Sequence, residues 1–355
     1  MKKFIYTVLF SIFLIGCATT NKVEYSADDI AREELREEFE NFSGLPRMIE
    51  KGFDLDKLCK MNDGLEMVEY LQPFFIDENE MPLDQHVSIK IGNYEVKTRS
   101  QMVIDFSDEY GSKDELLNKG YKEDEIFYYP YFNGEWKDGY RVGKKRMNNW
   151  PIHKSGYEKN YSVNSEKALL IGLNNFRIRN DVDDNEEYYN EISKSDKEYL
   201  ILDLSYNFGG LYISWLSLVE SIHKMNPKEI FVLCSDRAFS LGDNAPSWIE
   251  AATKIKTTII GYPTSGAWKN IKTSKVLKFK YFTINCNIND NSYWHKLDWD
   301  NYNLPYPTEG IGATPDIYTN GNAINSLEVV KHLIGDDELS LPEDYVRRIS
   351  WDNQE

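Results

Sequence analysis

Ser240 is the residue of this chain whose position best suits covalent chemistry. It follows the apolar run 230–234 and precedes a helical pattern that begins at residue 243. A serine between a strand and a helix lies near free backbone N–H groups and the positive end of the helix dipole. Those donors can stabilise an oxyanion, so Ser240 could act as a nucleophile in acyl transfer. The alternative is that Ser240 only caps the helix, as serine often does.

Two glycines, Gly209 and Gly210, follow a second apolar run at 199–204. Glycine allows close backbone approach and dihedral angles that other residues avoid, and an oxyanion-binding turn requires both. The same glycines would also permit an ordinary tight turn between a strand and a helix. A third apolar run, 257–260, ends in the glycine-containing turn 261–266.

These apolar runs predict how the candidate residues come together. Each run is bounded by turn signals, and helix-length segments separate them, which is typical of buried parallel strands in βαβ units. Active-site groups of open α/β sheets gather beyond the carboxyl ends of the strands. We therefore expect an α/β fold in which Ser240 and the glycine turns meet at one edge of a parallel sheet.

Four ordered motifs resemble those of the tricorn-like and C-terminal-processing serine peptidases. They are Leu202–Gly210, similar to Asp-Leu-Arg-x-Asn-x-Gly-Gly, Phe239–Asp243, similar to the nucleophile turn Phe-Ser-Ala-Gly-Glu, Ile260–Gly266, similar to Ile-Gly-Glu-Pro-Thr-Gly-Gly, and Gly310–Ile317, similar to Gly-Ile-x-Pro-Asp-Ile. The resemblance covers about residues 168–318. It implies a ClpP/crotonase-like α/β core with parallel strands and flanking helices, and hydrolysis of peptide bonds by an activated serine. It also implies Ser240 as the nucleophile and Gly209, Gly210 and Leu241 as the oxyanion hole.

The catalytic base differs between the two branches of that family. In the processing-protease branch a lysine follows the glycine turn, but this chain has Ala267 at that position. Lys269, two residues further on, is an alternative base only if the loop is rearranged. The tricorn-like branch uses histidine instead.

A histidine in the matching order lies far upstream of Ser240. Residues 84–87 resemble the Asp-x-His segment of the tricorn-like branch, with Gln85 in place of a serine. The resemblance implies His86 as the general base, because a neutral imidazole can take the serine proton near pH 7. It implies Glu309, six residues before Pro315, as the group that orients the imidazole.

The first residues of the chain predict export. Lys2 and Lys3 precede an apolar stretch at 4–15 that is too short to span a bilayer comfortably and is typical of a signal peptide. Residues 14–17 resemble a bacterial lipobox, which implies cleavage before Cys17 and lipid attachment to its thiol. An ordinary signal peptide with an incidental cysteine is the alternative. We expect a membrane-anchored lipoprotein of the bacterial cell envelope.

Charge and cysteine content limit the partners. The formal net charge of −17 makes nucleic acid and anionic membrane faces poor partners. No Cys/His spacing resembles a metal site, and the implied chemistry needs no cofactor. Cys234 is expected to be a small buried hydrophobe, whereas Cys59 and Cys286 could pair in an oxidising compartment.

Composition and residue pattern divide the chain into six expected segments. They are a signal peptide at 1–16, a tether at 17–25, an N-terminal helical unit at 26–86, a β-rich aromatic insertion at 87–165, a peptidase-like α/β core at 166–335 and a C-terminal tail at 336–355. Helical patterns are expected at 30–42, 46–60 and 63–75. A strand at 87–91 has a hairpin partner at 94–97. The aromatics of the insertion either pack its own core or form a platform for a peptide or a glycan.

These features favour an exported, lipid-anchored serine peptidase that cleaves peptides or unfolded tails. A second hypothesis is a degenerate relative that binds a peptide or small ligand without cleaving it. Four departures from the family motifs favour that hypothesis: Ala267 for lysine, Gln85 for serine, Leu241 for a small residue and Ser205 for arginine. A third hypothesis is an envelope lipoprotein whose acidic surface only scaffolds partners.

Overall fold

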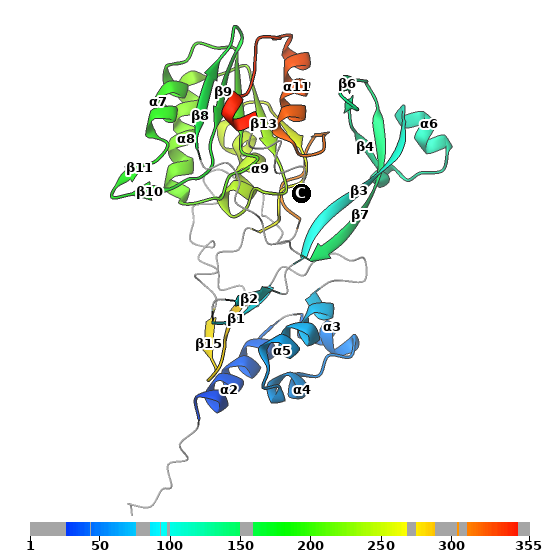
Figure 1. Ribbon diagram of the computed structural model, residues 1–355, viewed down its shortest axis with the longest axis vertical. Coiled ribbons are helices and arrows are strands. Elements are labelled where there is room, and N and C mark those ends of the chain that lie inside the picture. The colour runs from blue at the N-terminus through cyan, green and yellow to red at the C-terminus, as the bar shows by residue number, and fades with distance from the viewer. Residues whose placement is uncertain are drawn as a thin grey trace, which may run out of the picture.

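The computed structural model describes residues 26–42, 44–75, 86–92, 94–97, 100–149, 159–267, 275–287, 304 and 311–346. The chain has a mixed α/β fold around a six-stranded sheet. In Figure 1 this sheet and its helices lie at one end of the view, the N-terminal helices lie at the other, and a long β-hairpin rises beside the sheet. Within the described ranges, no helix combines the length and apolar character that a membrane span requires.

The six-stranded sheet carries the apolar runs of the sequence. Its strands are β8 (Tyr161–Asn164), β9 (Ala168–Gly172), β12 (Tyr199–Asp203), β13 (Glu229–Cys234), β14 (Thr257–Gly261) and β17 (Ile317–Tyr318), in the order β17-β14-β13-β12-β9-β8. Neighbouring strands from β9 to β17 pair in parallel, and β8 pairs antiparallel with β9. The parallel pairing expected of the three apolar runs is therefore confirmed.

Helices cover both faces of this sheet. They are α7 (Glu186–Lys194), α8 (Tyr212–Met225), α9 (Leu241–Thr253) and α11 (Ala323–Ile334). Alternate strand residues point to opposite faces, so Leu200 and Leu202 pack with α7, α8 and α9, whereas Ile201 packs with α11. Cys234 is fully buried in β13, as expected.

The N-terminal unit consists of short helices. They are α2 (Ala27–Glu40), α3 (Leu45–Glu50), α4 (Leu55–Lys60), α5 (Gly64–Leu71) and the 3-10 turn η1 (Gln72–Phe75). The single helix expected at 46–60 is wrong, because the chain turns at Gly52 with φ +89° and restarts at Asp54, whose side chain caps α4.

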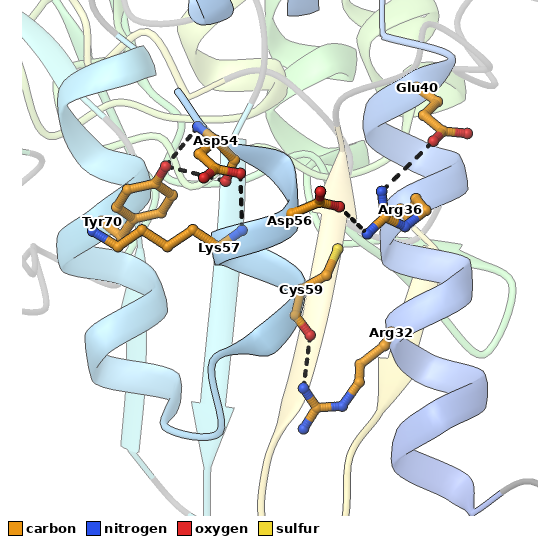
Figure 2. Close-up of polar contacts among 8 residues, drawn as sticks. All are labelled: Arg32, Arg36, Glu40, Asp54, Asp56, Lys57, Cys59 and Tyr70. Carbon is orange, nitrogen blue, oxygen red and sulfur yellow. Dashed lines mark hydrogen bonds and ion pairs between the residues drawn. The ribbon is translucent and has the colours of Figure 1, made fainter. Parts of the chain in front are cut away.

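Polar contacts join these helices to one another (Figure 2). On α2, Arg32 donates to the Cys59 carbonyl at 2.7 Å, and Arg36 pairs with Asp56 at 2.6 Å. The Tyr70 hydroxyl accepts from the Asp54 N–H at 2.7 Å and donates to its carbonyl at 3.1 Å. These contacts therefore fix α2, α4 and α5 relative to one another.

The second sheet has four strands in the order β15-β16-β1-β2. They are β15 (Lys275–Lys278), β16 (Thr283–Asn287), β1 (His86–Ile91) and β2 (Tyr94–Lys97), so the expected hairpin at 87–97 is confirmed. Its apolar side chains, such as Ile89 and Ile284, share one cluster with Leu35 of α2. Strands β1, β15 and β16 thus pack with the N-terminal helices. The sequence had assigned β1 to the insertion, and β15 and β16 to the core. Cys59 and Cys286 are separate buried thiols.

The insertion is built on a long hairpin. Its elements are β3 (Ser100–Gly111), α6 (Lys113–Asn118), η2 (Glu123–Glu125), β4 (Ile126–Tyr128), β5 (Tyr131–Phe132), β6 (Glu135–Trp136) and β7 (Tyr140–Asn149). Phe127 and Tyr129 are buried in a cluster that includes Tyr318 of the core sheet. In the short hairpin formed by β5 and β6, the Trp136 ring stacks on His332 of α11, with ring centroids 3.7 Å apart. These aromatics therefore pack between the insertion and the core.

Both ends of the expected core extend further than the sequence indicated. Strand β8 belongs to the core sheet although it lies before residue 166. After residue 335, Tyr345 is buried, and its hydroxyl donates to the Asp203 carboxyl at 2.7 Å. The Tyr161 hydroxyl donates to the same oxygen at 2.6 Å. Segments that the sequence placed in the insertion and the tail thus complete the core.

Candidate active site

Ser240 forms a sharp elbow between β13 and α9. Its backbone has φ +58° and ψ −127°, a combination that a non-glycine residue seldom adopts and that costs free energy. It occupies the N-cap position of α9, but its side chain makes no capping hydrogen bond, so the capping alternative is wrong. The side chain is partly exposed. A serine held on a strained strand-to-helix turn presents its hydroxyl for reaction.

Backbone hydrogen bonds hold the elbow in this conformation. The Ser240 N–H donates to the Ala267 carbonyl at 2.7 Å, and the Ser240 carbonyl accepts from the Asp243 N–H at 3.1 Å. The Asn244 side chain also donates to the Ser240 carbonyl, at 3.2 Å. One residue earlier, the Phe239 N–H donates to the Asn207 carbonyl at 3.1 Å. The surrounding bonds therefore determine the unusual dihedral angles of Ser240.

Asn207 connects the elbow to the turn after β12. Its buried side chain donates to the Leu173 carbonyl at 2.8 Å and accepts from the Gly209 N–H at 2.8 Å. Together with its carbonyl bond to Phe239, these contacts join the ends of β9, β12 and β13. Sequence reasoning missed this role, although an asparagine between a buried strand and two glycines is a signal for it.

Glycine allows the two turns to touch. A β-carbon on Gly209 would lie 2.6 Å from the Ser240 Cβ and 2.7 Å from the Leu241 nitrogen. A β-carbon on Gly242 would lie 2.2 Å from the Asn207 carbonyl oxygen. Real β-carbons do not approach other atoms so closely, so both positions require glycine. The expected meeting of Ser240 with the glycine turn occurs at the carboxyl ends of the strands.

Two backbone N–H groups beside Ser240 remain available. No described residue accepts a hydrogen bond from the N–H of Gly210 or of Leu241. Leu241 is the first residue of α9, so its N–H belongs to the positive end of the helix dipole. The N–H of Gly209 differs from its expected role, because it already donates to Asn207. Of the three expected donors, Gly210 and Leu241 thus have N–H groups without an acceptor among the described residues.

The loop after β14 closes the other side of the elbow. The Gly266 N–H donates to the Asp243 carboxyl at 3.0 Å, and the Thr264 hydroxyl donates to the Asp243 carbonyl at 3.3 Å. The Thr264 hydroxyl also accepts from the Ala313 N–H at 2.6 Å. Ala267 is only 4% exposed, so a small buried side chain occupies the position where the processing branch has its lysine.

The other expected site residues lie wholly or partly outside the described residues. His86 begins β1, and its backbone pairs with Asn287 of β16, but its side chain is not described. Glu309, Lys269 and Cys17 lie outside the described residues altogether. Among the residues that are described, no group of three or more His, Cys, Asp or Glu side chains could hold a metal ion.

No family model and no curated protein matches the chain. Among solved structures, a candidate peptidase from Parabacteroides merdae aligns with 87% of this chain and 97% of its own, at 12% identity and a TM-score of 0.43. A lipoprotein from Streptococcus agalactiae aligns with 89% of this chain and 99% of its own, at 12% identity and a TM-score of 0.36. A candidate S41 protease from Bacteroides fragilis aligns with 57% of this chain and 62% of its own, at 14% identity and a TM-score of 0.34. In the last pair, this chain spans less than two thirds of the other protein's length.

Proposed function

We propose that the chain is a serine peptidase with a ClpP/crotonase-like core that hydrolyses peptide bonds in peptides or unfolded tails. The observation that best supports this proposal is the elbow at Ser240. Its hydroxyl does not cap α9, and no described residue accepts a hydrogen bond from the N–H of Leu241, the next residue, or of Gly210 in the turn that contacts the elbow. A helix cap would need neither the strained dihedral angles nor the close glycine contact.

In the proposed reaction, the Ser240 Oγ attacks the carbonyl carbon of the scissile bond while the His86 imidazole takes the hydroxyl proton. The carbonyl oxygen becomes an oxyanion that the Gly210 and Leu241 N–H groups stabilise, by roughly 3 kcal/mol for each well-placed donor. His86 then returns the proton to the leaving amine, the C–N bond breaks, and an acyl-serine remains. Glu309 orients the imidazole and stabilises its charged form.

Water completes the proposed cycle. His86 takes a proton from a water molecule, whose oxygen attacks the acyl carbon. The second oxyanion occupies the same two donors. Collapse of this intermediate breaks the ester bond, returns the proton to Ser240 and releases a carboxylic acid. Each step uses only side chains and backbone amides, so the proposed activity persists in a chelator such as EDTA.

Binding without cleavage is the second candidate function. It is favoured by Ala267, whose buried methyl group occupies the place of a lysine base next to Ser240. If this function holds, the chain binds peptides with the Ser240 hydroxyl intact and shows no turnover. The two functions are separated by measuring binding and cleavage of the same peptide.

The test of peptidase function compares Ser240→Ala with the wild-type chain on an unfolded, quenched-fluorescent protein substrate. Ser217→Ala is the matched control, because Ser217 lies on α8 of the same core and, among the described residues, its hydroxyl donates to Ile213 of the same helix. We expect Ser240→Ala to lose at least about 1,000-fold in turnover and Ser217→Ala to lose none. Equal turnover by Ser240→Ala and the wild type would overturn the assignment.

We further propose that the chain is exported and anchored to the cell envelope through a lipid on Cys17. The apolar stretch at 4–15 and the lipobox-like residues 14–17 support this proposal. Cys17→Ser should move the protein from the membrane fraction to the soluble fraction of fractionated cells. Retention of Cys17→Ser in the membrane fraction would contradict lipid anchoring.

A further inference from the structure

Tyr262 joins the loop beside Ser240 to the β-rich insertion. It follows β14 in the segment where the resembling motif has glutamate, and its side chain reaches strand β3. The Tyr262 hydroxyl accepts a hydrogen bond from the Ile104 N–H at 2.5 Å and donates to the Ile104 carbonyl at 3.3 Å. One phenol thus satisfies both backbone groups of a single strand residue.

Burial makes this double contact costly to lose. Ile104 is 5% exposed, and β3 is an edge strand of the order β3-β7-β4, so no other described strand pairs with these groups on that side. Buried backbone groups without hydrogen bonds destabilise a fold more than the bonds themselves stabilise it. Burial also raises the pKa of Tyr262, which keeps the hydroxyl protonated and able to donate.

The ring of Tyr262 adds apolar contacts to the same junction. It packs with Phe106 of β3, their centroids 6.4 Å apart, in the cluster that also holds Phe127 and Tyr318. On the core side, the Tyr262 N–H donates to the Cys234 carbonyl at 3.2 Å, at the end of β13. Tyr262 is therefore fixed to the insertion by its side chain and to the core sheet by its backbone.

From Tyr262 an unbroken series of contacts leads to the elbow. Two residues on, Thr264 bonds to Asp243 of α9, and the Ser265 N–H donates to the Ala238 carbonyl at 3.1 Å. The described part of the loop ends at Ala267, whose carbonyl accepts a hydrogen bond from the Ser240 N–H at 2.7 Å. A displacement of Tyr262 would therefore be transmitted through a short, hydrogen-bonded loop to the backbone of Ser240.

We propose that Tyr262 is a positioning residue through which the insertion holds the Ser240 elbow in its reactive conformation. A substrate or partner that moves the insertion would then alter the reactivity of Ser240 without touching it. The effect on reactivity rests on the proposed peptidase function, whereas the mechanical connection between Ile104 and Ser240 does not.

The connection is tested by hydrogen–deuterium exchange of Tyr262→Phe, which keeps the ring and removes both bonds to Ile104. We expect the Ser240 amide to exchange about tenfold faster, along with the Ile104 amide, because a tenfold change corresponds to about the free energy of one net hydrogen bond. Tyr318→Phe is the matched control, since its buried ring belongs to the same cluster and no bond from it to Ile104 exists in the described part of the chain. Faster exchange at Ile104 with unchanged exchange at Ser240 would overturn the inference.

Reactivity is measured in the same variants with a small fluorophosphonate. We expect Tyr262→Phe to label about tenfold more slowly and to lower kcat at unchanged KM, while Tyr318→Phe behaves as the wild type. Equal labelling rates for Tyr262→Phe and the wild type would also overturn the inference. If the wild type itself is not labelled, the proposed peptidase function fails, and the exchange experiment still decides the connection. Phe106→Leu keeps the Tyr262 hydroxyl and removes the aromatic contact between Tyr262 and β3. We expect the Ser240 amide to exchange faster in this variant as well.

Discussion

Gly209 lies so close to Ser240 that a β-carbon on the glycine would be 2.6 Å from the serine Cβ. The two residues come from different βα turns, which follow β12 and β13. A β-carbon on Gly209 would also lie 2.7 Å from the Leu241 nitrogen, so the turn that carries Gly209 and Gly210 touches the first residue of α9. The oxyanion site that we propose therefore depends on the absence of a side chain at residue 209.

Gly209→Ala should abolish Ser240 reactivity and lower the free energy of unfolding by about 3 kcal/mol. The new methyl group meets the Ser240 Cβ, the Leu241 nitrogen and the Phe239 oxygen, two of which are backbone atoms that cannot rotate away. The measurement is fluorophosphonate labelling together with thermal unfolding. Gly52→Ala is the control, because Gly52 also has positive φ, but its new methyl group would meet no described atom within 4 Å. Full labelling of Gly209→Ala would show that the contact is not required.

Asn207→Ala should destabilise the chain by about 3 kcal/mol, because it leaves the Gly209 N–H and the Leu173 carbonyl buried without their partner. We also expect slower labelling of Ser240, since the turn that holds Gly210 loses its fixed position. Chemical denaturation and labelling rates measure both effects. Asn164→Ala is the control, because Asn164 is exposed on β8 and its side chain donates to Glu191 at 2.9 Å rather than to a buried backbone group. Equal stability of the two variants would contradict the role given to Asn207.

The sequence predicted the parallel strands of the core and the place where Ser240 meets the glycine turn, because short segments of the chain carry the signals for both. The parallel strands were predictable because the apolar runs 199–204, 230–234 and 257–260 are short, end in turn signals and are separated by helix-length segments. The meeting of Ser240 with the glycine turn followed from the rule that such residues gather at the carboxyl ends of strands. The positive φ of Ser240 was not predictable, because it arises from bonds to Ala267 and Asp243 that form only in the fold.

Long-range packing accounts for what sequence reasoning missed. Strand β16 pairs with β1 across nearly two hundred residues of sequence, so nothing near residue 86 indicates the second sheet. The burial of Tyr345 against Asp203 likewise depends on residues far apart in the chain. The split of the expected helix 46–60 is different, since Gly52 and Asp54 are local stop and start signals that apolar periodicity outweighed.

His86→Ala should reduce peptide turnover by several orders of magnitude while leaving the unfolding temperature close to that of the wild type. The reason is that the proposed base is lost and Ser240 keeps its proton. The matched variant is Lys269→Ala, which removes the alternative base. Normal turnover in His86→Ala combined with loss in Lys269→Ala would reject the histidine in favour of the lysine.

Tyr345→Phe should lower the free energy of unfolding by about 1–2 kcal/mol, because the Asp203 carboxyl loses one of its two phenol donors in a buried site. Tyr281→Phe serves as the control, since Tyr281 is 70% exposed. Urea denaturation of both variants gives the comparison. If Tyr345→Phe is as stable as the wild type, the segment after residue 335 is not part of the cooperative core.

The most direct test of the account is to locate the site of covalent labelling. Intact-mass measurement after reaction with a fluorophosphonate gives the number of adducts, and fragmentation of the tryptic peptide 238–254 distinguishes Ser240 from Ser247. We expect one adduct on Ser240 of the native protein and none on the Ser240→Ala variant. A native protein that gains no adduct, or gains it on another serine, would contradict the assignment of Ser240 as the nucleophile.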